Sequence, residues 1–236
     1  MITRKPPEDA PALLWAAPFD AREVERVKAV HQIWVGSPVP EHLAKLRTSW
    51  YREMPNWEHW TWLEDDIAAL ELENQDLYDR APELVPADAV GQYRADIARY
   101  EILYRYGGVY ADMDTTCQRS IEPLTVPEKM TVGWEVQNRF IGNTVIYAPK
   151  GHPALREIIN KLPEWAREAP ARPNKLSGPK AISTILRNRA DVVYLDSDIW
   201  YPVPWDQPER STDPHPNAYV VHHWQHQRDL RGIPWV

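Results

Sequence analysis

Cysteine is almost absent from this chain of 236 residues, because Cys117 is the only one. An internal disulfide is therefore excluded, and a reducing, cytoplasmic location is the simplest expectation. Long apolar runs are missing as well, since no stretch approaches the roughly 18 apolar residues of a membrane-spanning helix. The first seven residues, MITRKPP, lack the apolar core and cleavage site of a signal peptide. We therefore expect no transmembrane segment, while peripheral contact with a membrane through a partner stays open.

Positive charge is also scarce, because 27 Lys and Arg residues face 34 Asp and Glu residues and give a formal net charge of −7. Broad affinity for nucleic acid depends on Lys and Arg that neutralise phosphates, so this balance argues against a nucleic-acid partner. Phenylalanine is rare, with two Phe against 12 Trp and 11 Tyr. Trp and Tyr combine a flat apolar face with a polar edge, which suits sugars and bases as well as a protein core.

One acidic motif stands out against these absences. Asp112 and Asp114 are separated by a single residue and follow the run 107–111, GGVYA. Like charges at short range raise each other's pKa, and a divalent cation removes that cost. Carboxylate oxygens are preferred ligands of Mn²⁺ and Mg²⁺. The glycine pair and the short apolar run predict a helix end, a tight turn and a buried strand that delivers both carboxylates at its C-terminal edge.

Apolar periodicity predicts strands that alternate with helices in the first half of the chain. Further strands than the one before Asp112 are expected at 30–35, 57–63, 130–135, 141–148, 192–195 and 219–222. Helices are expected at 40–53, 65–70, 75–80, 91–106, 153–167 and 179–187. This order favours an α/β fold with a mostly parallel sheet flanked by helices, in which ligands bind at the carboxyl ends of the strands. Residues 1–27 are expected to form an N-terminal arm or a peripheral helix, and residues 28–236 a single domain.

Several motifs together resemble the D-x-D glycosyltransferases of family 32, which include yeast α-mannosyltransferases and bacterial capsular sugar transferases. The strongest is the block 94–114, with RADIARY at 94–100 and YGGVYADMD at 106–114. Weaker matches are HQIW at 31–34, IGN at 141–143, GP at 178–179, YP at 201–202 and VHHW at 221–224. The block is also similar to the catalytic core of the clostridial glucosylating toxins. The resemblance implies a GT-A fold, a Rossmann-like sheet flanked by helices.

The resemblance also implies an activity, the transfer of a hexose from a nucleotide sugar with the help of Mn²⁺ or Mg²⁺. A UDP-hexose is the favoured donor and GDP-mannose stays open, as does the acceptor, which could be a glycan, a lipid-linked sugar or a small molecule. Asp112 and Asp114 would ligate the metal ion, with Asp112 on the side of the site that faces the sugar. His222 or His223 would be the third ligand. The family retains the anomeric configuration.

Asp96 and Arg99 are neighbours on the predicted helix 91–106, because they are three positions apart. By resemblance they would bind the hydroxyls of the donor hexose, so that the implied catalytic set is Asp96, Arg99, Asp112 and Asp114. The alternative is an ordinary intrahelical ion pair. Trp34 is expected beside the base. The whole donor-binding set comprises His31, Gln32, Ile33, Trp34, Asp96, Arg99, Tyr110, Asn143 and Gly178.

Two other functions compete with this interpretation. The run 112–116, DMDTT, also fits the nucleophile motif of haloacid-dehalogenase-like phosphatases, with Lys180 and the pair Asp196 and Asp198 as downstream partners. That interpretation leaves the motif around Asp96 unexplained. A non-catalytic carbohydrate-binding protein is the second alternative, and the abundance of Trp and Tyr suits it.

The C-terminal segment departs from the family pattern. Family members carry Ser-Trp shortly after the C-terminal histidine, whereas residues 225–228 here are QHQR. Arg228 or Trp235 could substitute in closing over the donor. An inverting reaction would need a base for the acceptor hydroxyl, and Glu135 and Asp196 are candidates that no motif marks.

Overall fold

A six-stranded sheet forms the centre of the protein, for which a computed structural model describes residues 28–235. The predicted arm 1–27 lies outside the described residues. The strand order is β2-β1-β3-β6-β5-β7, and β6 is antiparallel to both of its neighbours while the other pairs are parallel. All strands of this sheet except β6 therefore run in one direction. The strands are β1 (Ala29–Ile33), β2 (Glu58–Trp62), β3 (Gly108–Ala111), β5 (Met130–Val136), β6 (Phe140–Ala148) and β7 (Val192–Leu195).

A short antiparallel ribbon lies beside this sheet. It consists of β4 (Thr115–Cys117) and β8 (Val220–His222), with Thr115 opposite His222. Because β4 follows the D-x-D motif directly, the ribbon brings the C-terminal part of the chain to the end of β3.

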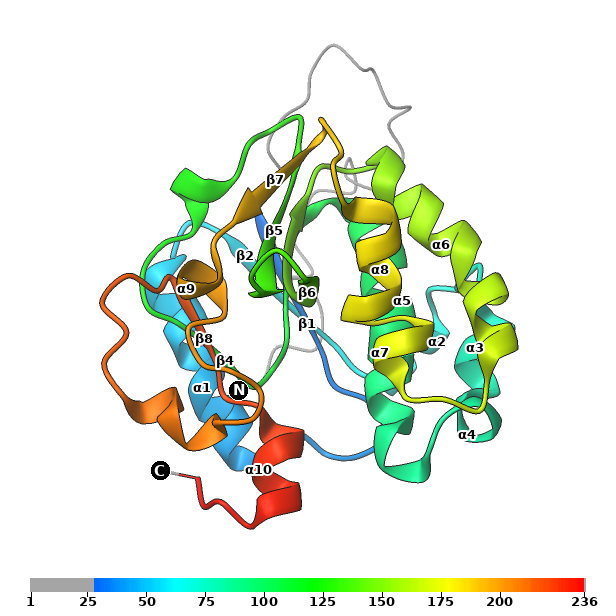
Figure 1. Ribbon diagram of the computed structural model, residues 1–236, viewed down its shortest axis with the longest axis horizontal. Helices are drawn as coiled ribbons and strands as arrows, with labels where there is room; N and C mark the ends of the chain where they lie inside the picture. The colour runs from blue at the N-terminus through cyan, green and yellow to red at the C-terminus, as the bar shows by residue number, and fades with distance from the viewer. Residues whose placement is uncertain (1–27, 236) are drawn as a thin grey trace.

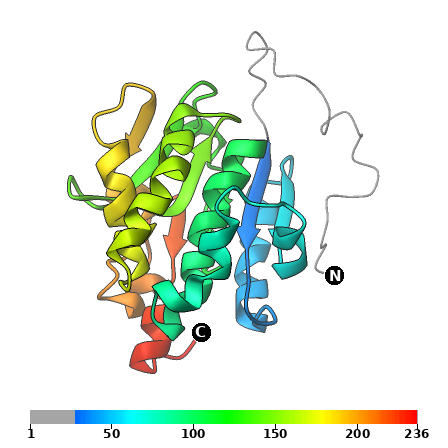
Figure 2. The ribbon, with the colours of Figure 1, turned by 90° about the vertical axis from the view of Figure 1, so that its right-hand side faces the viewer.

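Helices cover both faces of the sheet, as Figures 1 and 2 show. One face packs against the long helix α5 and the helices around it, through an apolar cluster that includes Ile97, Leu103, Ile146 and Leu155. The other face packs against α1, α9 and the ribbon, through a cluster that includes Trp50, Val109 and Trp200. The helices are α1 (Glu41–Glu53), α2 (Glu64–Ala68), α3 (Gln75–Asp79), α4 (Ala81–Leu84), α5 (Val90–Tyr106), α6 (Pro153–Trp165), α7 (Pro173–Leu176), α8 (Pro179–Leu186), α9 (Ser197–Trp200) and α10 (Gln225–Arg231).

The turn between α5 and β3 has the form that the sequence predicts. Helix α5 ends at Tyr106, and Gly107 follows with φ of +70°, a conformation that a Cβ atom disfavours. A Cβ atom at Gly107 would also lie 2.7 Å from the backbone nitrogen of Lys150. Nε2 of His31 donates a hydrogen bond of 2.9 Å to the Gly107 carbonyl, which ties the turn to β1. Strand β3 is buried along its length and ends directly before Asp112.

The predicted fold class is confirmed, and the predicted strands and helices lie close to the observed ones. The first strand ends at Ile33 rather than at residue 35. Strand β4 and helices α4, α7, α9 and α10 were not predicted. These elements span three to seven residues, which is too few for periodicity to separate them from loops. Within residues 28–235, none of the helices has the length and apolar character needed to cross a bilayer.

Candidate active site

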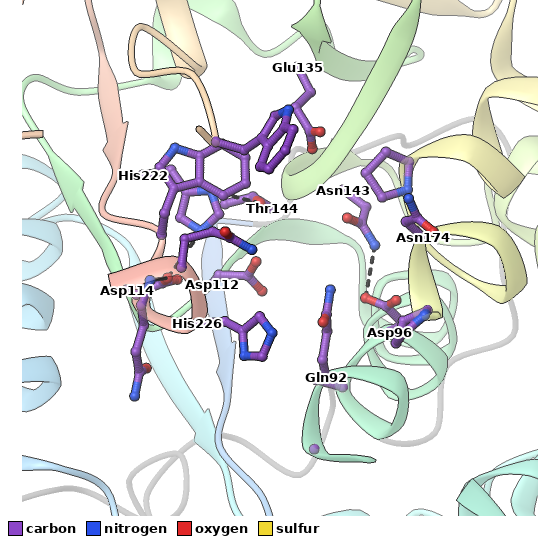
Figure 3. Close-up of a pocket in the computed structure, with 18 of the residues that line it drawn as sticks. Gln92, Asp96, Asp112, Asp114, Glu135, Asn143, Thr144, Asn174, His222 and His226 are labelled. Atoms are coloured by element: carbon purple, nitrogen blue, oxygen red, sulfur yellow. Dashed lines mark hydrogen bonds and ion pairs between the residues drawn. The ribbon is translucent and has the colours of Figure 1, made fainter. Parts of the chain in front are cut away.

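A cavity of about 870 Å³ opens at the carboxyl ends of β1 and β3. Figure 3 shows Asp112 near its middle, between Glu135 at one end and Gln92 at the other. The side of α5 contributes Gln92, Asp96 and Arg99 to the wall. The other walls come from the segment after β1, from β5 and β6, from α7 and α8, and from β8 and α10. The cavity therefore lies where the sheet topology places ligands.

Asp112, Asp114 and His222 meet on the wall of this cavity. Each offers one ligand atom, and the three atoms lie within 4.8 Å of one another. The distance between Nε2 of His222 and Oδ2 of Asp114 is 3.1 Å. His223 points elsewhere, with Nε2 3.1 Å from Oγ1 of Thr116 and Nδ1 3.2 Å from Oγ of Ser211. The structure therefore places His222, and not His223, beside the two carboxylates.

Asp114 and His222 stabilise each other's charged form. Burial opposes ionisation of Asp114, but the charge and hydrogen bond of His222 and the backbone N–H of Gln225, 2.8 Å away, lower its pKa to about 2. Burial likewise disfavours the imidazolium of His222, yet Asp114 outweighs this and raises the pKa of His222. Because a metal ion and a proton compete for the same imidazole nitrogen, metal binding here would release that proton.

Two carboxylates and one imidazole are a suitable ligand set for a divalent ion. The carboxylate oxygens suit both Mg²⁺ and Mn²⁺, while the imidazole nitrogen favours the transition metal. The side chains leave room for the ion's remaining ligands, because all three line an open cavity. The residues present therefore fit the metal ion that the sequence predicts.

Asp112 is connected to helix α5 through Arg99. A nitrogen of the Arg99 guanidinium lies 3.1 Å from Oδ1 of Asp112 and 2.9 Å from Oδ1 of Asp96. The hydroxyl of Tyr110 donates to Oδ1 of Asp112 at 2.6 Å, and the Arg99 guanidinium lies over the Tyr110 ring. Asp96 and Arg99 thus form the intrahelical ion pair that was the alternative interpretation, and they also line the cavity.

Asp96 is almost completely buried at the centre of a polar network. Ser177 donates to its Oδ2 at 2.6 Å and the amide of Asn143 donates to its Oδ1 at 2.9 Å, as the dashed line in Figure 3 shows. Burial raises the pKa of Asp96 to about 6, although Arg99 and these hydrogen bonds oppose the shift. The network fixes the carboxylate in one position at the cavity wall.

The structure brings most of the predicted donor-binding residues to the cavity and leaves three away from it. Of these residues, the ones that line it are Ile33, Trp34, Asp96, Arg99, Tyr110 and Asn143. His31 is completely buried, and its Nδ1 accepts a hydrogen bond from Trp62. Gln32 is buried beneath the site and its amide lies 3.4 Å from the carbonyl of Asp112.

Gly178 is the third residue that does not line the cavity. A Cβ atom there would lie 2.9 Å from Cα of Asn174, so Gly178 allows α7 and α8 to approach closely. His31, Gln32 and Gly178 therefore lie outside the cavity wall and support the site from behind, and their contact with the donor stays a prediction.

Several cavity residues were not part of the predicted site. Gln92 precedes Asp96 by one helical turn, so the i to i+4 spacing could have revealed it. Arg139, Arg172 and Lys180 supply positive charge opposite the acidic residues, and sequence pattern does not single them out. Glu135, which the sequence suggests only as a possible base, also lines the cavity. Burial raises its pKa to about 7, while His222 opposes the shift and Asp112 adds to it.

Other expectations for the C-terminal part are wrong. Arg228 is buried and donates to the backbone carbonyls of His223, Pro208 and Pro234, so it does not close over the cavity. Trp235 instead stacks on His42, with ring centroids 4.3 Å apart.

The phosphatase constellation is not assembled either. Asp196 accepts a hydrogen bond from Gln137, and Asp198 lines a second cavity instead of the one that contains Asp112.

Comparison with known proteins supports the resemblance. Residues 40–131 match the family described as a glycosyltransferase sugar-binding region containing a DXD motif. This part of the chain is therefore similar to the sugar-binding region of the DXD glycosyltransferases. Inositol phosphoceramide mannosyltransferase 3 of Schizosaccharomyces pombe is 29% identical over 141 residues, which cover 59% of this chain and 38% of that protein. Mannosyl phosphorylinositol ceramide synthase SUR1 of Saccharomyces cerevisiae is 33% identical over 104 residues, 41% of this chain and 25% of that protein. The chain therefore spans less than half the length of these relatives.

The fold of this DXD protein is also that of solved glycosyltransferases. The PaToxG glycosyltransferase superposes with a TM-score of 0.58 at 18% identity, over 68% of this chain and 69% of that chain. At this identity the match concerns the fold alone, and it agrees with the GT-A architecture that the motifs imply.

Proposed function

We propose that the protein is a metal-dependent hexosyltransferase that takes its sugar from a nucleotide-sugar donor. The observation that carries this proposal is the cluster of Asp112, Asp114 and His222 at the carboxyl end of β3, on the wall of the large cavity. The match of residues 40–131 to the DXD sugar-binding region supports it. A carbohydrate-binding protein without activity has no need for two adjacent carboxylates that repel each other.

The residues of the cavity suit the parts of a nucleotide sugar. Asp112, Asp114 and His222 would hold the metal ion, which when bound neutralises the charge that builds up on the departing diphosphate. Lys180, an exposed residue of the opposite wall, adds positive charge for the phosphates. Trp34 lies at the end of β1, where it would meet the base.

The buried pair of Asp96 and Arg99 would orient the hexose. A fixed carboxylate accepts hydrogen bonds from sugar hydroxyls, and a fixed guanidinium donates them. In the transfer, the acceptor oxygen forms a bond to the anomeric carbon of the hexose. The bond from that carbon to the diphosphate oxygen breaks, and its electron pair stays on that oxygen. The acceptor attacks from the face that the diphosphate leaves, and its proton passes to the same diphosphate oxygen. This front-side attack gives the retained configuration that the family resemblance implies.

The identity of the donor is the finer part of the proposal. The relatives are named mannosyltransferases, which supports mannose as the sugar. The earlier preference for a UDP-hexose stays a prediction, so UDP-glucose, UDP-galactose and GDP-mannose form the set to be tested. A glycan, a lipid-linked sugar or a small molecule would be the acceptor, and we propose that the reaction takes place in the cytoplasm.

Thermal unfolding with each nucleotide sugar, with and without Mn²⁺, tests the proposal. A ligand at about 100 times its Kd stabilises the folded protein by about 2.7 kcal/mol. We expect one donor to raise the melting temperature, only when Mn²⁺ is present, and to be slowly hydrolysed. Stabilisation by none of the donors would contradict the proposal. Hydrolysis of a simple phosphate ester in Mg²⁺ would instead favour a phosphatase.

A further inference from the structure

A second cavity of about 530 Å³ adjoins the large one. The two share Glu135, Val136 and Trp205 in their walls, so these residues stand at the border between them. The rest of the second wall comes from the segment after β5, from α9 and from the loops on either side of the 3₁₀ turn 208–212. All of the residues that line this wall lie outside residues 40–131, the range of the family match.

Glu135 points into the space where the cavities meet. It belongs to β5, and in Figure 3 its carboxyl group is directed toward the cavity that contains Asp112 and His222. Among residues 28–235, no hydrogen bond or ion pair engages this half-buried carboxylate, although Asp96, Asp112 and Asp114 are each bonded. A half-buried carboxylate without a partner is costly, and hydroxyl groups of a ligand would satisfy it.

Trp205 is an exposed indole on a fixed backbone. Its side chain is 49% exposed, which is the second-largest value among the exposed large hydrophobic residues described. Pro204 precedes it and restricts the backbone dihedral φ at that position. Trp224 donates to the carbonyl of Val203 at 2.9 Å, and Arg231 donates to that of Asp206 at 2.6 Å. The loop is therefore anchored on both sides of a half-exposed indole.

A flat apolar ring next to carboxylates is the pattern that binds a hydroxylated ring. The apolar face of a pyranose covers the indole, and its hydroxyl groups donate to carboxylate oxygens. Glu135 at the border and the exposed Asp198 and Asp206 in the wall supply such oxygens.

We propose that the second cavity is the acceptor subsite and that it binds a pyranose ring, stacked on Trp205 with one hydroxyl at Glu135. This inference rests on the proposed function, because it is the nucleotide sugar in the large cavity that makes the second cavity an acceptor site. The bound hydroxyl would then face the donor at the border between the two cavities. No loop would have to move to bring the two substrates together.

Saturation-transfer NMR with the methyl α-pyranosides of mannose, glucose and galactose tests the subsite, in the presence of diamagnetic Mg²⁺ and saturating UDP or GDP. We expect at least one glycoside to receive saturation, and Trp205→Ala to weaken its binding on the order of tenfold. Trp205→Phe, which keeps an aromatic face, should retain most of the affinity. Tyr51→Ala is the matched control, because Tyr51 is an aromatic residue of α1 that is 38% exposed and lines neither cavity.

The outcomes separate the subsite from the proposed function. Binding of UDP and of GDP, measured by calorimetry on the same samples, reports on the large cavity alone. If either nucleotide binds with Mg²⁺ but no glycoside receives saturation, or if Trp205→Ala leaves glycoside binding unchanged, the subsite proposal is overturned. If glycoside binding depends on Trp205 but neither UDP nor GDP binds, the second cavity is a sugar site and the proposed transferase function fails.

Discussion

The two cavities that meet at Glu135 differ in how their polar groups are held. In the large cavity, Asp96, Arg99, Asp112 and His222 are each fixed by at least one hydrogen bond or ion pair. In the second cavity, Trp205 and most of the wall around it are exposed. Groups that stabilise developing charge act best when they are oriented before the reaction. The fixed cavity suits the chemistry, and the exposed one suits recognition of a partner substrate.

The residues of the two cavities also come from different parts of the chain. Residues 40–131, which match the DXD sugar-binding region, contain Asp96, Arg99, Asp112 and Asp114. Glu135 and Trp205 lie beyond this range. Most of the residues that we propose for the donor therefore lie within the range of the family match. The residues that we propose for the acceptor lie outside it.

The largest loss of activity is expected from Asp114→Asn, which changes a proposed metal ligand in the large cavity. The amide keeps the size of the side chain but removes the charge that pairs with His222. We expect metal-dependent donor hydrolysis to fall on the order of 100- to 1,000-fold in kcat. Steady-state kinetics at several Mn²⁺ concentrations measures the loss. Unchanged turnover in a folded variant would remove Asp114 from the proposed site.

Asp96→Asn tests how strongly the buried network contributes to stability. Removing one partner of a buried ion pair costs about 3 kcal/mol when the remaining charge has no other partner. Arg99 keeps its ion pair with Asp112, so we expect a loss below this value. Asp88→Asn is the control, since Asp88 forms an exposed pair with Arg172 at 2.8 Å. That change should cost much less, because solvent screens an exposed ion pair. Urea unfolding of both variants gives the comparison, and equal losses would show that burial does not distinguish the two ion pairs.

The third prediction concerns pH and His31, which lies behind the fixed cavity. Burial lowers the pKa of His31 from 6.5 to about 4, while its bond to Gly107 opposes the shift. As the pH falls below 6.5, His31 binds a proton in the unfolded chain but not in the folded protein. The free energy of unfolding therefore declines between about pH 6.5 and 4. The loss from this group is on the order of 3 kcal/mol. The variant His31→Gln should unfold with a shallower pH dependence over that range, and an identical slope would contradict the assignment.

Trp205→Ala should have the smallest effect on stability. Its ring is half exposed, and surface substitutions of this kind change the free energy of unfolding by about 0.5 kcal/mol or less. Thermal unfolding without ligands measures this. A loss above about 2 kcal/mol would mean that Trp205 serves the core, and the contrast between the two cavities would then be smaller than we infer.

The central part of the fold was predictable because its signals are local. The glycine pair after a periodic apolar helix predicts the turn at Gly107, and alternation and length predict β3 before Asp112. The spacing of Asp96 and Arg99 predicts that they are neighbours, and the structure places them 2.9 Å apart. In these cases the deciding contacts lie within about one helical turn or one strand.

The rest of the site depends on pairings between distant segments. His222 reaches Asp114 because β4 and β8 pair with Thr115 opposite His222, 107 residues apart in the sequence, and neighbouring histidines do not reveal that register. The buried position of His31 follows from the sheet pairing that surrounds it with aromatic rings. Glu135 and Trp205 both lie at the border between the two cavities. No spacing in the sequence indicates that they share this position.

Calorimetric titration of UDP into the protein, first with Mn²⁺ and then with EDTA, tests the central claim most directly. If Asp112, Asp114 and His222 hold a metal ion that binds the donor diphosphate, UDP should bind with Mn²⁺ and lose most of its affinity in EDTA. His222→Ala should weaken binding only in the presence of the metal. Equal affinity in Mn²⁺ and EDTA, or no binding of UDP or GDP under either condition, would contradict the account.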